Sequence, residues 1–262
     1  MKFARVATDG QIYYGIVEGD TIQLIDGDPF GDLHLSRTSL PLADCQLLAP
    51  VRPRHVYAVG LNYHAHIDEF KHIDPTRAAT EAPITFLCAE TAICGPSDDI
   101  ILDSRTDEIH YEGELVAIIG KTCRSVSAAD ALNYVLGYTI GNDVSNRTQQ
   151  RADKQWLRAK SHPTYKPLGP IIATDIPDPQ QLHVTTTVNG ELRQQGNTSQ
   201  MIFPVASLIA HISSFTTLQP GDVIYTGTPA GVGPLHAGDT VSITIEGIGT
   251  LTNTAKYIEG KE

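Results

Sequence analysis

Cysteine is scarce in this chain of 262 residues, and the four cysteines that occur form no C-x-x-C pair. The spacing therefore indicates neither a disulfide framework nor a zinc-finger pattern. Long apolar runs are also missing, since none approaches the roughly 18–20 residues that span a membrane. The opening residues, MKFARVATDG, lack the apolar segment of a signal peptide. We therefore expect a cytoplasmic protein with reduced thiols and no membrane partner.

Positive charge is in short supply as well. The chain has 19 Lys and Arg residues against 30 Asp and Glu residues, which gives a formal net charge of −11. A surface of this charge repels polyanions, and this argues against nucleic acid or an anionic membrane as the main partner. A small molecule is the partner that we expect, because a local pocket can be basic in an acidic protein.

Short β-favouring runs organise most of the chain. The stretch RVATDGQIYYGIVEGDTIQLID alternates such runs with turn signals and predicts β-hairpins in a small N-terminal domain, residues 1–50. Prolines and arginines around Val51 mark a boundary, and residues 51–262 form the second domain. We predict a helix over 127–136 with Ser127 as its N-cap, and another over SLIAHISSF at 207–215. Scattered strands with few helices predict an α+β fold dominated by β-structure.

Two carboxylates stand one residue apart in the stretch IHYEGELVAIIGK. If this stretch is a strand, Glu112 and Glu114 leave the same face, with Gly113 opposite. Like charges this close repel each other unless a cation lies between them. Asp143 ends a second predicted strand, GYTIGND, and an all-oxygen set of this kind suits Mg²⁺ or Mn²⁺. The alternative is a pair of solvated glutamates on an edge strand together with a turn aspartate.

The stretch VGLNYHAHIDEF places a histidine and a carboxylate three residues apart. On a helical turn, His66 and Glu69 share one face, and the carboxylate would fix the imidazole tautomer that a general base needs. The alternative is a surface pair in a polar loop. A zinc site with His64 is disfavoured, because no second Cys or His cluster follows at a usable spacing.

Polar side chains that can hold an anion follow Asp143. Arg147 and Gln150 are three residues apart, and Lys160 lies in RAKSHPTYKPLGP. Near a metal ion they would bind a substrate carboxylate and stabilise a developing oxyanion. Thr228 lies in a Gly/Pro-rich loop, YTGTPAGVGP, whose backbone N–H groups can also receive an anion. Alternatively, these charges are solvated and the loop is a structural turn.

Six stretches, taken in order, resemble the fumarylacetoacetate hydrolase family: GLNYHAHIDE, HYEGELVAIIG, GYTIGNDVSNRTQQ, RAKSHPTYKPLGP, GDVIYTGTPAGVG and GDTVSITIEGIGTLTN. The resemblance runs from about Val56 to the end of the chain. It implies the family's mixed β-sandwich roll, preceded by a small N-terminal β-rich domain, and a homodimer. It also implies a metal site for Mg²⁺ or Mn²⁺ at Glu112, Glu114 and Asp143.

The same resemblance assigns roles to the remaining polar residues. His66, Glu69 and Lys160 fall on catalytic positions, and Phe70 to Arg77 fall on a lid. Arg147, Gln150 and Thr228 fall on positions that contact substrate. The chain departs from the family pattern at Ser161-His162-Pro163-Thr164 and at Thr148-Gln149-Gln150. Both departures lie near the expected pocket and leave the substrate open.

The expected reaction follows from a metal ion that chelates a 2-keto acid and stabilises its enolate. Our first hypothesis is a hydrolase that cleaves a carbon–carbon bond in acylpyruvate or fumarylpyruvate substrates, with His66 activating water. Decarboxylation of oxaloacetate and keto–enol or double-bond isomerisation of hydroxymuconate-type diacids use the same ligands. A metal-dependent keto-acid binding protein without turnover is the alternative outside enzymology.

Overall fold

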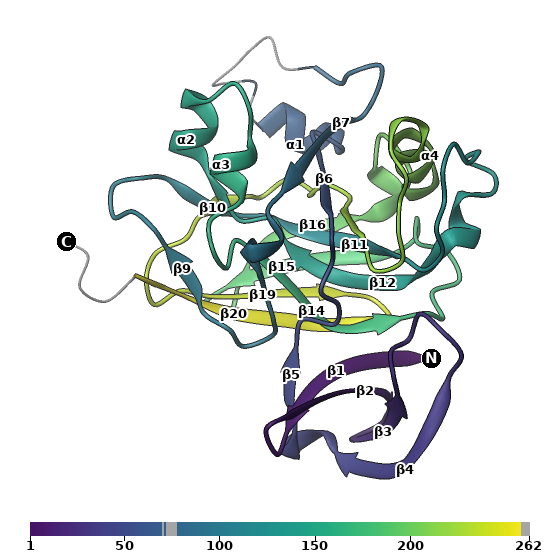
Figure 1. The fold of residues 1–262 in the computed structure, drawn as a ribbon. Helices are drawn as coiled ribbons and strands as arrows, with labels where there is room; N and C mark the ends of the chain where they lie inside the picture. The colour runs from purple at the N-terminus through teal and green to yellow at the C-terminus, as the bar shows by residue number, and fades with distance from the viewer. Residues whose placement is uncertain (70, 72–77, 258–262) are drawn as a thin grey trace.

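A computed structural model describes residues 1–69, 71 and 78–257 of the chain. Five strands form the N-terminal lobe, drawn purple in Figure 1: β1 (Lys2–Thr8), β2 (Gln11–Glu18), β3 (Thr21–Asp26), β4 (His34–Pro41) and β5 (Gln46–Leu48). The β1–β2 turn is built by Asp9 and Gly10, both at positive φ. The predicted N-terminal hairpins are therefore present.

The largest sheet joins this lobe to the rest of the chain. Its order is β4-β3-β2-β1-β14-β12-β11-β17-β6-β7, with β5 paired to β1 and β8 paired to β14. The strands outside the lobe are β6 (Val56–Gly60), β7 (Ile84–Cys88), β8 (Ile93–Cys94), β11 (Gly113–Ile119), β12 (Val135–Asn142), β14 (Lys166–Ala173) and β17 (Val223–Tyr225). Because Phe3 of β1 pairs with Ile172 of β14, the N-terminal strands continue the main sheet.

A second sheet packs against the first around the apolar core. It has the order β16-β15-β19-β20-β9 and consists of β9 (Ile100–Leu102), β15 (His183–Val188), β16 (Glu191–Asn197), β19 (Thr240–Ile245) and β20 (Gly249–Tyr257). A small third sheet holds β13 (Ser145–Asn146), β10 (Ile109–Tyr111) and β18 (Gly233–Pro234). At Gly113 the two large sheets come so close that an added Cβ would lie 2.4 Å from Thr186 Oγ1.

Helices are few and short, which confirms the β-dominated fold. They are α1 (His64–Glu69), α2 (Arg147–Ala152), α3 (Leu157–Lys160) and α4 (Val205–Phe215), and 3₁₀ turns occur at Leu42–Asp44, Glu90–Ala92, Ala131–Tyr134 and Thr198–Gln200. Figure 1 shows α1, α2 and α3 together at one end of the sheets. Helix α4 confirms the predicted helix at 207–215, with Leu208, Ile209 and Ile212 buried. No helix in the described part of the chain is both long and apolar enough to cross a membrane.

The helix predicted over 127–136 is wrong. Ser127 Oγ bonds the Asp130 carboxylate in a turn, a single 3₁₀ turn follows, and β12 already begins at Val135. The reason is tertiary, because Val135 pairs with Ile119 of β11, and pairing with a buried strand outweighs a weak local helix preference. The predicted strand GYTIGND is present as the second part of β12, which ends at Asn142.

Candidate active site

Three carboxylates meet where β11 begins and β12 ends. Glu114 is the second residue of β11, Glu112 lies between β10 and β11, and Asp143 directly follows β12. The antiparallel register pairs Gly113 with Asn142, and the Asp143 N–H donates to the Glu112 carbonyl at 2.9 Å. One oxygen from each carboxylate lies within 4.8 Å of the others, and all three side chains are buried. The predicted acidic cluster is therefore formed by the fold.

Two hydrogen bonds fix the glutamates of the cluster, one at the backbone of Glu112 and one at the carboxylate of Glu114. The Glu112 N–H donates to Asn142 Oδ1 at 2.9 Å, and Glu114 Oε2 accepts the Gly227 N–H at 2.7 Å. Gly227 has a φ of +97°, a conformation that glycine adopts without the steric penalty of a side chain. The Gly/Pro loop thus turns a backbone donor onto a buried carboxylate, which accounts for its composition.

Three cations surround the three carboxylates. Lys160 Nζ lies 2.7 Å from both Glu112 Oε2 and Asp143 Oδ2, and Arg147 Nη2 donates to Glu112 Oε1. On the other side of Asp143, Lys166 Nζ lies 2.6 Å from Oδ1. Lys166 is fully buried and also donates to the Lys160 carbonyl at 2.6 Å. Burial of these charged groups is possible because Glu112 and Asp143 are paired with the three cations, whereas Glu114 accepts only a backbone N–H among its described contacts.

The surroundings push the pKa values of the two glutamates in opposite directions. Burial raises the pKa of Glu112, but Arg147 and Lys160 together outweigh it and hold that pKa well below its usual range. Burial raises the pKa of Glu114 well above its usual range, and the neighbouring charges of Asp143 and Glu112 raise it further. Glu114 is therefore the carboxylate that most needs an added cation to be ionised.

The predicted dyad lies on α1 beside this cluster. His66 Nδ1 is 3.2 Å from Glu69 Oε2, and Glu69 Oε1 accepts the Gly231 N–H at 3.0 Å. His66 is buried and lines the same cavity as Glu112 and Glu114. Glu69 is thus fixed by a backbone donor on one oxygen and holds the imidazole with the other. This is the geometry of a base oriented by a carboxylate.

The remaining predicted residues also line this cavity. Arg147 Nη1 donates to Gln150 Oε1 at 2.8 Å, so α2 presents both polar ends together. Thr228 Oγ1 donates to the Gly113 carbonyl at 2.9 Å and accepts from Gln194 Nε2 at 2.7 Å. All nine residues named from the sequence are therefore brought together by contact or around one cavity. Phe70 and residues 72–77, part of the expected lid, lie outside the described residues.

Trp156 is a cavity residue that the sequence did not single out. It lines the cavity with Val59, Gly60 and Leu61, and a Cβ on Gly60 would lie 2.3 Å from its indole ring. The ring also meets Phe86 edge-on, with centroids 5.2 Å apart. The sequence feature that could have identified Trp156 is its residue type, because it is the chain's one tryptophan and lies in an otherwise polar stretch. The cavity that these residues enclose measures about 20 Å³.

The two departures from the family pattern contact each other. His162 Nε2 is 2.8 Å from Gln149 Oε1, and His162 Nδ1 is 3.3 Å from Asp103 Oδ2. Tyr165 stacks obliquely on the His162 ring and donates to Asp103. Neither His162 nor Gln149 lines the cavity. Their contact connects α2, which carries Arg147 and Gln150, to the segment that follows Lys160.

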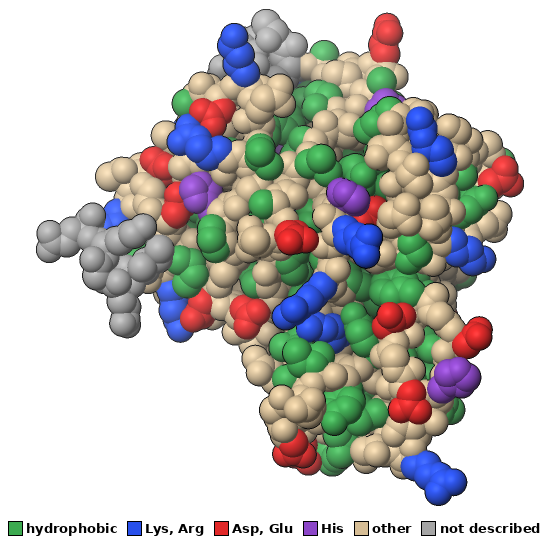
Figure 2. Space-filling view, in the orientation of Figure 1, with side chains coloured by type: hydrophobic (Ala, Val, Ile, Leu, Met, Phe, Trp, Pro, Cys, Tyr) green, Lys and Arg blue, Asp and Glu red, His purple; other side chains and the backbone are tan. Residues whose placement is uncertain are grey.

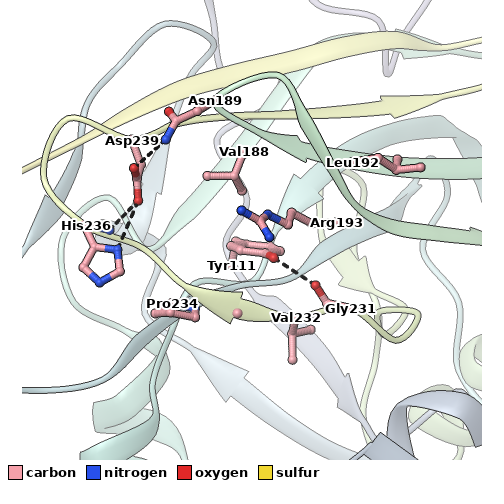
Figure 3. Close-up of a pocket in the computed structure, with 11 residues that line it drawn as sticks. Tyr111, Val188, Asn189, Leu192, Arg193, Gly231, Val232, Pro234, His236 and Asp239 are labelled. Atoms are coloured by element: carbon pink, nitrogen blue, oxygen red, sulfur yellow. Dashed lines mark hydrogen bonds and ion pairs between the residues drawn. The ribbon is translucent and has the colours of Figure 1, made fainter.

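A separate cavity of about 550 Å³ opens on the other side of the Gly231 loop, as Figure 3 shows. Tyr111 Oη donates to the Gly231 carbonyl at 2.9 Å, and the Arg193 side chain lies over the tyrosine. At the far end, Asp239 accepts from Asn189 and the His236 backbone. This cavity shares its Gly231 wall with the dyad and carries none of the acidic cluster.

Comparison with known proteins decides the family. Residues 55–256 match the family model described as fumarylacetoacetate (FAA) hydrolase C-terminal, and residues 1–50 match one described as Rv2993c-like, N-terminal. The chain belongs to the fumarylacetoacetate hydrolase family. Members are metal-dependent hydrolases, isomerases or decarboxylases, and the chain is an enzyme of this family.

Several relatives cover nearly the whole chain. Protein Rv2993c from Mycobacterium tuberculosis is 46% identical over 97% of this chain and 97% of its own. The structure of a 5-carboxymethyl-2-hydroxymuconate delta-isomerase from Mycobacterium smegmatis is 47% identical, with a TM-score of 0.91 over 98% of this chain and 100% of that one. The human mitochondrial oxaloacetate tautomerase FAHD2A is 42% identical over 82% of this chain and 70% of its own.

A more distant structure holds a metal ion. The maleylpyruvate hydrolase from Sphingobium sp. SYK-6, in complex with manganese(II) and pyruvate, is 31% identical, with a TM-score of 0.81 over 98% of this chain and 99% of that one. The buried acidic cluster of the present chain fits a divalent ion by its donor chemistry, since hard cations prefer carboxylate oxygens. The family and the cluster together indicate a divalent metal cofactor.

Proposed function

We propose that this enzyme interconverts the keto and enol forms of a small 2-keto diacid of the oxaloacetate type, with Mg²⁺ or Mn²⁺ as cofactor. The observation that carries the proposal is the joint placement of a base and an acid. His66, which Glu69 holds, and the Lys160 ammonium both line the cavity with Glu112 and Glu114. Keto–enol interconversion needs one group to move a proton at carbon and another to stabilise charge at oxygen.

Glu112, Glu114 and Asp143 are the residues that would hold the metal ion. All three offer oxygen ligands, and their oxygens lie within 4.8 Å of one another. A bound ion would supply positive charge beside the keto-acid oxygens and so favour the enolate. The other residues can be assigned from their own contacts.

His66 is the proposed base at the carbon between the two carbonyl groups. In the tautomer that places a proton on Nδ1 toward Glu69, Nε2 is the nitrogen that would accept the substrate proton. Lys160 and Arg147 carry the positive charge that stabilises the enolate oxygen and holds a substrate carboxylate. Gln150, whose oxygen is held by Arg147, offers its amide N–H groups, and Thr228 would offer its hydroxyl by giving up its bond to the Gly113 carbonyl.

The sequence identities of the relatives support the proposal of isomerisation over hydrolysis. The relatives named as a tautomerase and an isomerase are 42% and 47% identical to this chain, whereas a fumarylacetoacetate hydrolase and the maleylpyruvate hydrolase are 37% and 31% identical. The contacts of the acidic cluster do not separate the two reactions, because both pass through the same enolate. The preference for isomerisation over hydrolysis therefore rests on the relatives. The proposal of chemistry through an enolate rests on the residues of the site.

Carbon–carbon bond hydrolysis of an acylpyruvate or fumarylpyruvate substrate is the second candidate. The observation that favours it is the same dyad, because an imidazole held by Glu69 can also take a proton from water. Decarboxylation of oxaloacetate uses the enolate without an attacking water. These reactions release pyruvate, whereas isomerisation of oxaloacetate releases none, and this separates them by product.

The test follows the ultraviolet absorbance of enol-oxaloacetate, with and without Mn²⁺, against blanks that contain metal alone. A second assay measures pyruvate released from acetylpyruvate, fumarylpyruvate and oxaloacetate. We expect the enzyme to accelerate loss of the enol, and His66→Ala to remove most of that acceleration. Pyruvate release from an acylpyruvate, without faster enol loss, would establish the hydrolase instead.

A further inference from the structure

A third cavity lies where the N-terminal strands meet the rest of the chain. Its volume is about 510 Å³, and its walls come from β1, β5, the connection after β5, and the segment around β8. We call it the junction cavity. Three arginines line it: Arg5 on β1, and Arg52 and Arg54 on the connection to β6. Figure 2 shows basic side chains gathered on the face just above the N-terminal lobe, in a protein whose net charge is −11.

Arg5 is the unusual member of this group. The residue is only 8% exposed, and its Nη1 donates to one backbone carbonyl, that of Ala49, at 3.3 Å. No carboxylate in the described part of the chain forms an ion pair with it. A guanidinium carries five N–H donors and is rarely buried without a counter-charge, because desolvation of the ion is then not offset.

The surroundings of Arg5 add to the unfavourable energy of its buried charge. Burial lowers the pKa of Arg5, and the positive charge of Arg52 lowers it further, with Tyr14 acting in the opposite direction. Tyr14 is uncharged at neutral pH, since burial raises the pKa of its phenol. Two like charges therefore line one cavity. Such a pair is stabilised when an anion lies between the two guanidinium groups.

Two carboxylates, Glu90 and Asp98, also line the cavity. Asp98 Oδ2 accepts the Gly95 N–H at 2.7 Å, so a backbone donor already holds it. Neither carboxylate forms an ion pair with the three arginines among the residues that the structure describes. The cavity thus offers the positive charges of the arginines and, apart from them, the carboxylate oxygens of Glu90 and Asp98 as hydrogen-bond acceptors. This combination suits an anion that also carries hydroxyl groups.

We propose that the junction cavity binds a small oxyanion, a phosphate or carboxylate group, between Arg5, Arg52 and Arg54. Arginine is suited to this role because its planar fork binds both groups in a bidentate manner. The ligand would connect the N-terminal lobe, through Arg5, to the chain segment that leads into β6. The site is distinct from the acidic cluster, because its lining shares no residue with the active-site cavity.

The test uses the full chain with inorganic phosphate, citrate and chloride as probes at matched ionic strength. Calorimetry and thermal unfolding are measured with Mn²⁺ and oxalate present, so that the active-site cations are already engaged. We expect phosphate or citrate to raise Tm by about 3 °C at ten times its Kd, and chloride to have no such effect. Whichever of the two anions binds more tightly identifies the chemical group.

Arg52→Gln and Arg54→Gln are the informative variants, because both side chains are exposed and neither change endangers folding. Each should weaken binding about tenfold. Arg37→Gln, an exposed change of equal charge on β4, should bind as the unchanged protein does. Equal binding by all variants, or no binding by the unchanged protein, would overturn the proposal. An anion effect that appears only after the oligomer dissociates in sedimentation would assign the cavity to a partner's carboxylate and also overturn the proposal.

Discussion

At the scale of single residues, the main feature of the site is the Lys160 ammonium between two carboxylates. Lys160 Nζ lies 2.7 Å from oxygens of both Glu112 and Asp143. An ammonium in that position competes with a divalent ion for the same oxygens. The site therefore balances two requirements, a cation for the substrate and free ligands for the metal.

This competition predicts the behaviour of Lys160→Met. Removing one positive charge from a buried acidic cluster should strengthen Mn²⁺ binding about tenfold or more. Turnover should nevertheless fall by at least a hundredfold, because the charge that stabilises the enolate oxygen is gone. Lys154→Met, a matched change at an exposed position, should alter neither quantity. Weaker metal binding in Lys160→Met would show that Lys160 supports the metal instead of competing with it.

The raised pKa of Glu114 predicts that stabilisation of the fold by a bound metal ion depends on pH. The pKa of Glu114 is raised by burial and by the nearby charges of Asp143 and Glu112, so its protonated form stabilises the metal-free protein. That stabilisation is fully present below the unfolded pKa of a glutamate and is lost as pH rises through the raised folded pKa. Since the metal binds the carboxylate, the increase in Tm on adding Mn²⁺ should grow as pH rises.

Thermal unfolding with and without Mn²⁺ across a pH series measures this growth. Glu114→Gln cannot ionise at this position and should show a small, nearly constant increase in Tm. A metal effect that is independent of pH in the unchanged protein would mean that Glu114 is already ionised before the metal binds.

At the scale of secondary structure, Gly113 explains how the site stays compact. Its position between two glutamates leaves the far face of β11 open to β15, with Thr186 Oγ1 2.4 Å from where a Cβ would lie. The second sheet can approach this closely only when the strand carries no side chain there. Gly113 therefore has two roles: it lets the two sheets pack closely, and it separates Glu112 from Glu114 by one residue.

Gly113→Ala tests this packing. The added methyl group meets strand atoms of a buried sheet, and overpacking of this kind lowers the free energy of unfolding by about 1–3 kcal/mol. Thr186→Ala removes the nearest atom and should recover part of the loss in the double variant. Gly31→Ala, with nothing within 4 Å of its Cβ, should unfold in denaturant as the unchanged protein does. A neutral Gly113→Ala would show that the sheets can separate without loss of stability.

Local sequence patterns predicted some elements and missed others for physical reasons. The acidic cluster was predictable because strand periodicity and the family's motifs agree on Glu112 and Glu114. The helix expected at 127–136 was wrong because pairing with β11 decides its second half. Lys166 was missed because lysines are normally exposed, and only the fold reveals the 2.6 Å contact with Asp143.

At the scale of the whole molecule, the N-terminal lobe shares packing with the remainder of the chain. Phe3 and Ile25 belong to the same buried cluster as Val116 and Ile172, and β1 pairs with β14. The division at residues 50 and 51 and the homodimer both remain predictions. Sedimentation of the purified protein measures its oligomeric state directly and so tests the homodimer.

Deletion of residues 1–50 tests whether the chain divides into two domains at residues 50 and 51. Removing β1 exposes the edge of β14 and the apolar residues that Phe3 covers, so the shortened chain should aggregate or melt at a much lower temperature. Solubility and circular dichroism during heating provide the measurement. A soluble fragment with unchanged Tm and activity would mean that the lobe is an independent domain in spite of the shared sheet.

The central claim is that Glu112, Glu114 and Asp143 form a metal centre, and titration with Mn²⁺ in a calorimeter tests it most directly. The account predicts one ion bound per chain, and a loss of affinity of a hundredfold or more in Asp143→Asn and Glu112→Gln. Asp26→Asn, an exposed change of the same kind, should bind as the unchanged protein does. Unaltered Mn²⁺ affinity in both cluster variants would contradict the account.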